Sequence, residues 1–380
     1  MDFELTEEQR LIQRTAREFA DRVIAPRARE LDRTGTFPAE FLPKLAEIGF
    51  MGIVIPEAYG GSGLGQVTQV LIMEELHRAC AATGVTVSVH NSLVGGPLAK
   101  FGTEAQKKRY LPRMARAEIL GAYCLSEPDY GSDAAGLKTR YVEDGGVFKL
   151  TGTKAWITNG AQADLFIIFA TREPAAGPKG ISAFLVEKGF PGITIGKKEQ
   201  KLGIRASSTV QVHLDRCEVP RENVLGKEGE GFKIAMDTLD GGRIGIATQA
   251  IGIARASLER AVKYARERKQ FGERIVDFQA IQWKLADMTM EVDAARLLTL
   301  RAAWLRERGQ TCTRESSMAK LFASEAANRA AREAVQVHGG WGYVADFDVE
   351  RYYRDAKITE IYEGTSEIQR VVISRPYVRD

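Results

Sequence analysis

The chain has 380 residues, of which 44% are apolar and 27% charged, so it has the composition of an ordinary globular protein and is too long for one compact core. Its 53 Lys and Arg residues nearly balance its 50 Asp and Glu residues without basic clusters, and its four cysteines are far apart with no zinc-ligand spacing. We therefore expect a cytoplasmic protein with reduced thiols, no metal site and no nucleic-acid partner. No apolar run approaches the roughly 20 residues that span a bilayer, so no membrane span or secretion is expected.

Helical patterns fill the first 118 residues, which we expect to form an N-terminal helical domain (1–118). Thr6 and Gln9 have the spacing of a capping box, and apolar residues recur at helical intervals after them. Thr103 and Gln106 repeat that spacing. The further helical stretches are 38–48, 67–81, 92–101 and 103–117. The glycine-rich loop 60–65 lacks the G-x-G-x-x-G spacing and is expected to be a connector.

Short runs of β-branched and aromatic residues follow, separated by Gly, Pro and Asp. These runs are 122–125, 138–143, 147–151, 165–171, 181–186 and 209–214. Asp144, Gly145 and Gly146 between two of them predict a hairpin. Because no helical period intervenes, the pattern indicates an antiparallel barrel or sandwich, and we expect a middle β-barrel domain at 119–228.

Helical periodicity returns after Gly231 and predicts a C-terminal bundle of antiparallel helices at 229–380. Ser366 and Gln369 have capping-box spacing, so the last helix is expected to run from Ser366 to the breaker Pro376.

Glu363 lies just before that helix, between the bulky Tyr362 and the flexible Gly364. Such a setting suits a carboxylate with a raised pKa, which makes Glu363 a candidate catalytic base. The alternative is a solvated charge near a helix dipole.

Small polar loops supply the other candidates. A strand end with Ser126 and backbone amides, together with Trp156 and Thr158, would suit a flat polar heterocycle, while Arg268 and Phe271 could supply a phosphate fork and a stacking face. Taken singly, each has an ordinary structural explanation as a turn, a core residue or a solvated helix end.

Six motifs occur together and in order: C-L-S-E-P-x-x-G-S-D, W-I-T-N-G, G-R-I-G-I-A, R-K-Q-F-G, Q-V-H-G-G and I-Y-E-G-T-S-E-I-Q. In this order and at these separations the chain resembles the acyl-CoA dehydrogenase family over essentially its whole length. The resemblance implies a helical domain, a β-barrel, a four-helix bundle, bound FAD, and a homotetramer built as a dimer of dimers.

The resemblance also implies roles for individual residues. Glu363 would be the catalytic base. Cofactor contacts would be Tyr123, Cys124, Leu125, Ser126, Ser132, Trp156, Ile157, Thr158, Thr365, Ser366 and Glu367, with Arg268, Phe271, Gln279, Gln336, Val337, His338, Gly339 and Gly340 reaching the FAD of a neighbouring subunit. Substrate contacts would be Ser132, Asp240, Arg243, Tyr362 and Gly364.

In the implied reaction, Glu363 removes the proton next to the thioester carbonyl while a hydride leaves the neighbouring carbon for the flavin, giving a trans-2-enoyl-CoA. Some branches of the family carry the base on the helix just before the residue matching Arg243, but that position is Gly242 here. The segment 239–247 and Glu367 resemble short-chain members, and electrons are expected to pass to an electron-transferring flavoprotein. A branched-chain or dicarboxylic acyl-CoA dehydrogenase, an acyl-CoA oxidase, and a non-catalytic acyl-CoA-binding assembly factor remain as alternatives.

Overall fold

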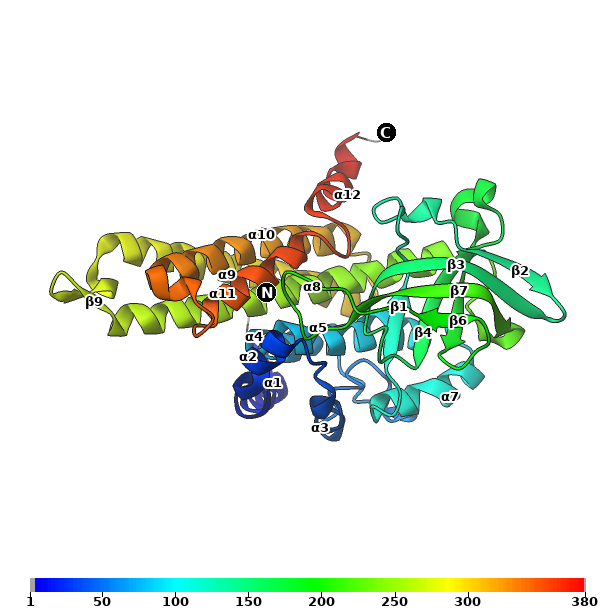
Figure 1. Cartoon of the computed structure of the whole chain (residues 1–380), viewed down its shortest axis with the longest axis horizontal. Helices are drawn as coiled ribbons and strands as arrows, with labels where there is room; N and C mark the ends of the chain where they lie inside the picture. The colour runs from blue at the N-terminus through cyan, green and yellow to red at the C-terminus, as the bar shows by residue number, and fades with distance from the viewer. Residues whose placement is uncertain (1–3, 379–380) are drawn as a thin grey trace.

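The computed structural model describes residues 4–378 and consists of a helical N-terminal region, a middle β-sheet and a helical C-terminal region. Figure 1 shows the sheet at one end of the molecule, with the long C-terminal helices extending away from it and the first helices packed below them. The expected order of helical, β and helical regions is therefore confirmed.

The N-terminal region begins at the first predicted capping box, which is formed. The hydroxyl of Thr6 accepts a hydrogen bond from the Gln9 N–H at 3.1 Å, and the Gln9 side chain accepts one from the Thr6 N–H at 3.0 Å. Thr103 and Gln106 form the same pair of bonds. The helices are α1 (Glu7–Phe19), α2 (Ala25–Thr34), α3 (Leu42–Glu47), α4 (Gln66–Ala79), α5 (Ala81–Ser88), α6 (Gly96–Phe101) and α7 (Glu104–Ala115).

The middle region is one eight-stranded mixed sheet. Its strands are β1 (Gly121–Cys124), β2 (Arg140–Asp144), β3 (Val147–Thr158), β4 (Leu165–Thr171), β5 (Ile181–Glu187), β6 (Ile193–Ile195), β7 (Thr209–Pro220) and β8 (Val224–Leu225). The hydrogen-bonded order is β6-β7-β3-β2-β4-β5-β8, with β1 paired in parallel to β4. The predicted hairpin is confirmed, because Asp144 of β2 pairs with Val147 of β3.

The prediction of a closed antiparallel barrel was wrong. Closure requires the two outer strands of the sheet to pair, and within residues 4–378 β6 and β8 do not pair with each other. The parallel strand β1 lies against β4, and all seven residues of β4 are buried. The unbroken apolar run of β4 is the signature of a strand covered on both faces, as in parallel sheets, and not of a strand with one solvated face.

Three long helices form the frame of the C-terminal region: α8 (Gly231–Glu267), α9 (Gln279–Glu307) and α10 (Thr313–His338). A small hairpin of β9 (Lys269–Gln270) and β10 (Glu273–Arg274) joins α8 to α9. The shorter α11 (Val349–Ala356) packs on α8 and α10, and α12 (Ser366–Val378) packs on α10. The predicted helix end at Pro376 was wrong, because α12 continues to Val378: a proline so near a helix end removes only one of the last backbone bonds.

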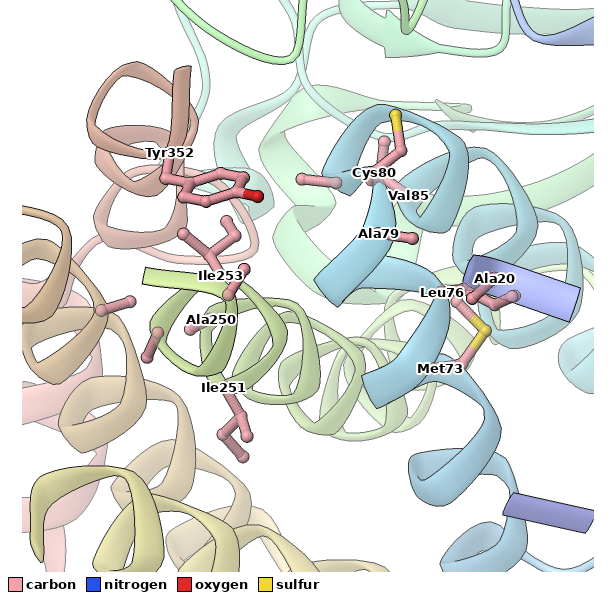
Figure 2. Packing of buried hydrophobic residues seen from close by; sticks show 14 of the residues in the cluster. Ala20, Met73, Leu76, Ala79, Cys80, Val85, Ala250, Ile251, Ile253 and Tyr352 are labelled. Carbon is pink, nitrogen blue, oxygen red and sulfur yellow. The ribbon is translucent and has the colours of Figure 1, made fainter. Parts of the chain in front are cut away.

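The N-terminal helices hold α8 in place through a shared core. Figure 2 shows Met73 and Leu76 of α4 and Val85 of α5 in the same apolar cluster as Ile251 and Ile253 of α8. The ion pairs of the fully buried carboxylate of Glu74 with Arg255 of α8 and Arg296 of α9 add a charged contact. The N-terminal helices thus fix the position of α8, the helix that contains Gly242.

Candidate active site

Glu363 lies in a tight turn that precedes α12 and is held from two directions. Its φ angle is +57° and that of Gly364 is +91°, so two consecutive residues adopt the left-handed conformation. The carbonyl oxygens of both residues accept hydrogen bonds from the Gln369 side-chain amide, at 3.1 and 2.9 Å. The Gly364 carbonyl also accepts one from Lys320 Nζ at 2.7 Å. A left-handed conformation at a residue other than glycine is uncommon, and these contacts stabilise it here.

The capping box predicted for Ser366 and Gln369 was wrong. Thr365 caps the helix instead, because its hydroxyl accepts a hydrogen bond from the Ile368 N–H at 3.3 Å. The Ser366 hydroxyl has no partner among residues 4–378, and the Gln369 amide is committed to the turn that carries Glu363.

The carboxyl group of Glu363 faces Gly242, in the N-terminal third of α8. Its Oε2 atom is buried and has no hydrogen-bond partner in the described part of the chain. A Cβ atom added at Gly242 of α8 would lie 1.9 Å from this oxygen. Glycine at 242 therefore provides the space that the Glu363 carboxyl occupies.

Burial raises the pKa of the Glu363 carboxyl to about 7, and the positive charges of Arg243 and Lys320 act in the opposite direction. The group can thus take up a proton near neutral pH, as a general base must. The backbone N–H of Glu363 donates no hydrogen bond to any residue in 4–378. A free donor beside the base could bind a developing oxyanion.

The groups next to Glu363 are polar and partly unsatisfied. The Arg243 side chain is buried and pairs with Asp240 at 2.8 Å, while its Nε atom has no partner among the described residues. The hydroxyl of Tyr123 likewise has no partner in that part of the chain, and its pKa is raised by burial and by the charge of Glu363. Unpaired polar atoms are costly inside a protein, so their gathering here indicates a site that a ligand completes.

A second set of predicted residues lies on the β-sheet. Tyr123 and Cys124 end β1, Leu125 and Ser126 follow them, and Trp156, Ile157 and Thr158 end β3. The Ser126 carbonyl accepts a hydrogen bond from the Ala155 N–H at 2.9 Å, so the two segments lie side by side. Trp156 has a φ of +63° and is 63% exposed, which leaves its ring free as an aromatic wall.

A buried ion pair fixes this pair of segments. Lys154 of β3 donates to Glu127 at 2.8 Å and to the Leu125 carbonyl at 3.1 Å. Burial raises the pKa of the Glu127 carboxyl, but Lys154 and the hydrogen bonds outweigh it, so the pKa is lowered and the pair is ionised. An aromatic wall beside rigid backbone amides is the arrangement that a flat heterocycle such as a flavin requires, so the residues present fit that cofactor.

A third set lies far from Glu363 in the same chain. Arg268 follows α8 and is separated from Gly242 by 26 helical positions, or about 39 Å along the axis. Phe271 is 95% exposed with a φ of +51°. The His338 ring stacks on Tyr264 at 4.2 Å, near the same end of α8. Figure 1 shows the β9 hairpin at the end of the molecule opposite the sheet.

The remaining predicted residues are placed as follows. Ser132 is exposed in the loop after β1, and Gln279 is exposed at the start of α9. Val337 is buried, whereas Gln336, Gly339 and Gly340 are exposed around the C-terminal end of α10. Thr365, Ser366 and Glu367 line a cavity of about 220 Å³ beside Lys357 and Arg370.

Sequence reasoning missed Lys320, Lys154 and Gln249, and it gave Gln369 a capping role in place of its bonds to the turn. Lys320 is fully buried on a stripe of α10 that otherwise carries small residues such as Ala323 and Ala327, and a lysine in such a stripe was the available signal. Gln249 accepts a hydrogen bond from the Tyr362 hydroxyl, a contact between distant segments that no local pattern indicates.

Comparison with known proteins agrees with this fold. Family models match the chain as acyl-CoA dehydrogenase N-terminal domain at 6–118, middle domain at 122–217 and C-terminal domain at 229–377. The chain therefore belongs to the acyl-CoA dehydrogenase family.

Individual relatives are similar over nearly the whole chain. The mitochondrial short-chain specific acyl-CoA dehydrogenase of Mus musculus is 50% identical, over 99% of this chain and 91% of that protein. The structure of butyryl-CoA dehydrogenase from Megasphaera elsdenii has a TM-score of 0.98 at 44% identity, with full coverage of both chains. A chain in a structure of the electron transferring flavoprotein of Acidaminococcus fermentans has a TM-score of 0.98 at 48% identity, again with full coverage of both.

Among residues 4–378, no helix is long and apolar enough to cross a bilayer.

Proposed function

We propose that the protein is an FAD-dependent dehydrogenase that converts a short-chain acyl-CoA into the trans-2-enoyl-CoA. The observation that carries the proposal is the Glu363 carboxyl, buried against Gly242 with a pKa of about 7 and an unpartnered oxygen. The family of the chain and the short-chain and butyryl-CoA relatives support the same reaction class.

In this proposal Glu363 takes the proton from the carbon next to the thioester carbonyl. The free N–H of Glu363 donates to the thioester oxygen as negative charge develops there, which a carboxylate base alone could not stabilise. Arg243 lies beside the base and is held by Asp240, where its charge favours the ionised carboxylate before reaction. When bound, FAD supplies the acceptor for the hydride that leaves the neighbouring carbon.

The cofactor contacts are proposed for the loops that end β1 and β3. Tyr123 to Ser126 offer backbone groups, Trp156 offers an exposed ring, and Thr158 lies at the end of the same strand. The Lys154–Glu127 pair keeps these loops at a fixed separation. Ser132 and the Thr365–Glu367 segment complete the proposed contacts from the same chain.

A preference for short acyl chains is supported by a polar pair near the base. Gln249 lies seven residues, or two turns, beyond Gly242 on the same face of α8 and accepts the hydrogen bond from Tyr362. The Gln249 side-chain nitrogen has no partner within residues 4–378. A long alkyl chain laid against this amide would leave it unsatisfied, which disfavours long substrates.

We propose a homotetramer, a dimer of dimers, on two observations. The Arg268 and Phe271 end of the chain lies about 39 Å along α8 from Gly242, so both sets can contact one cofactor only if a second subunit supplies the far set. α9 also exposes Trp283, Met290, Leu297 and Trp304 at seven-residue spacing, an apolar stripe typical of a helix that packs on another subunit.

The domain boundaries are proposed near residues 118 and 228, in the connections between α7 and β1 and between β8 and α8. A cytoplasmic location and electron transfer to an electron-transferring flavoprotein also stay predictions. The neighbour from Acidaminococcus supports the latter.

Anaerobic titration with butyryl-CoA tests the function, with bleaching of the oxidised flavin band as the readout. The wild-type protein should be bleached, and the Glu363→Gln variant should be bleached several orders of magnitude more slowly while it keeps its FAD. Undiminished bleaching in that variant would refute the base, and no bleaching of the wild type by any of a panel of straight, branched and dicarboxylic acyl-CoAs would favour a non-catalytic binder. Turnover in air compared with turnover on an artificial acceptor separates an oxidase from a dehydrogenase.

A further inference from the structure

Lys320 is a buried cation next to the turn that carries Glu363. Its side chain is fully buried on α10, and its Nζ donates to the Gly364 carbonyl at 2.7 Å. Within residues 4–378 it forms no ion pair with a carboxylate closer than 4 Å. Removing an ammonium group from water without a directly paired counter-ion is costly, so the burial of Lys320 lowers the stability of the folded protein.

The position of Lys320 differs from that of the other cation near the base. Arg243 on α8 is bonded directly to Asp240, so part of its charge is already neutralised. Lys320 approaches from α10 and contacts the backbone of the turn itself. The two cations thus lie on different helices that both pack on the turn.

The charged and titratable groups around this pair come from several elements. Those that face Glu363 are Arg243, Lys320, Tyr123 and Tyr362, and those that face Lys320 are Glu363, Glu360, Glu367 and Arg243. Burial lowers the pKa of Lys320 to about 8, against the influence of Glu363 and Glu360. Near neutral pH Lys320 therefore keeps its proton while Glu363 is losing its own.

We propose that Lys320 is a positioning residue for the base: its bond to the Gly364 carbonyl holds the left-handed turn that directs the Glu363 carboxylate toward α8, and its charge keeps that carboxylate ionised. The inference rests on the proposed function, because it assigns a role within the same site. Lys320 acts through Glu363 and contacts neither substrate nor cofactor in this proposal.

The two parts of this role can be separated by variants. Lys320→Met removes both the bond and the charge. The acid limb of the plot of kcat/KM against pH, which follows the ionisation of Glu363, should therefore move up by about one pH unit, and kcat at pH 7 should fall. Lys320→Arg keeps the charge, so the acid limb should stay near its wild-type position. Gln369→Leu removes two bonds to the turn without removing a charge, so kcat should fall at every pH with the limb unmoved.

Lys201→Met is the matched control. Lys201 also has a pKa lowered by burial to about 8 and also donates to a backbone carbonyl, that of Ser207, at 2.7 Å. It has no contact with Glu363, so its variant should leave the acid limb in place, whatever its effect on stability.

A measurement without turnover gives a second readout. The unfolding midpoint of the Lys320→Met protein is compared with that of the Lys320→Met, Glu363→Gln double variant across pH, because the difference follows the titration of Glu363 alone. In both pairs that difference should begin near pH 4.5, but without Lys320 it should continue to grow to a higher pH and reach a larger value than in the corresponding pair with Lys320 intact.

An unmoved acid limb in Lys320→Met, with the wild-type protein active on an acyl-CoA, would overturn the role of Lys320 and leave the proposed function standing. A wild-type protein that no acyl-CoA reduces would overturn the proposed function instead. If Lys320→Met fails to fold, Lys320→Gln, which keeps a hydrogen-bond donor and loses the charge, carries the same prediction for the limb.

Discussion

Gly242→Ala should abolish most of the activity without damaging the fold. The added Cβ would lie 1.9 Å from Glu363 Oε2, whereas ordinary contacts begin at 3.4 Å, so the oxygen must move by about 1.5 Å. A misplacement of about 1 Å can cost about 10²-fold in rate, so kcat should fall by about 10²-fold or more. The stability should not fall, because the atom that must move is the end of a flexible side chain and alanine favours a helix over glycine by about 1 kcal/mol.

The rate of flavin reduction by butyryl-CoA, followed anaerobically by stopped flow, measures the effect. Gly241→Ala is the matched control: it changes the neighbouring glycine of the same helix, and the atoms nearest to its added Cβ belong to the end of the Arg306 side chain, at 3.1 to 3.3 Å. Gly241→Ala should reduce flavin at nearly the wild-type rate. If Gly242→Ala did the same while Glu363→Gln was inactive, the carboxyl could not occupy the space beside Gly242, and the geometry of the base would be wrong.

Three further outcomes are expected. Glu363→Gln should leave the stability unchanged near pH 4.5 and raise it by about 3 kcal/mol at pH 7 and above, measured from unfolding midpoints. The reason is that the folded pKa of Glu363 is about 7, so the wild-type protein loses stability as the pH rises from 4.5 to 7. A pH-independent difference between the two proteins would contradict the buried carboxyl. Glu127→Gln should destabilise the protein by about 3–5 kcal/mol because it removes the counter-charge of Lys154. The double variant Glu127→Gln, Lys154→Met keeps an acceptor for the N–H groups of Lys138 and Thr139 and should recover much of the melting temperature. Replacing both Trp283 and Leu297 by Glu should give a smaller particle in light scattering, and an unchanged mass would exclude the α9 stripe as an interface.

Local patterns in the sequence predicted local structure well. The boxes at Thr6 and Thr103 and the hairpin after Asp144 each depend on residues within a few positions of one another, and all three are formed. The box at Ser366 has the same spacing and is not formed, because the Gln369 amide bonds to the turn carrying Glu363 instead. When a side chain can bond either to its own helix end or to another part of the fold, the three-dimensional structure decides between them, and the spacing in the sequence does not show the outcome.

Long-range arrangement was harder to predict. The barrel prediction failed because the partner of β1 is β4, which begins 44 residues later at Leu165 and pairs in parallel with Gly121. The number of strands and their close spacing in the sequence do not show which strands pair at the edges of the sheet. In the candidate site, Glu363 and Gly242 were singled out from sequence motifs, but their contact joins segments 121 residues apart and is visible only in the fold.

That contact supports the proposal of a single carboxylate base in this chain. The Cβ of any side chain at position 242 would enter the space now filled by Glu363 Oε2, so a glutamate at 242 and a glutamate at 363 could not both keep their present geometry. If both were present and ionised, like charges would also raise one of the two pKa values strongly, as in a carboxylate dyad. With glycine at 242, the Glu363 carboxyl has room beside α8, and the cations that share its surroundings, Arg243 and Lys320, bring its pKa back toward neutrality from the higher value that burial alone would give. A catalytic base must be ionised to accept a proton, yet basic enough to remove one next to a thioester, and a pKa near neutrality meets both needs.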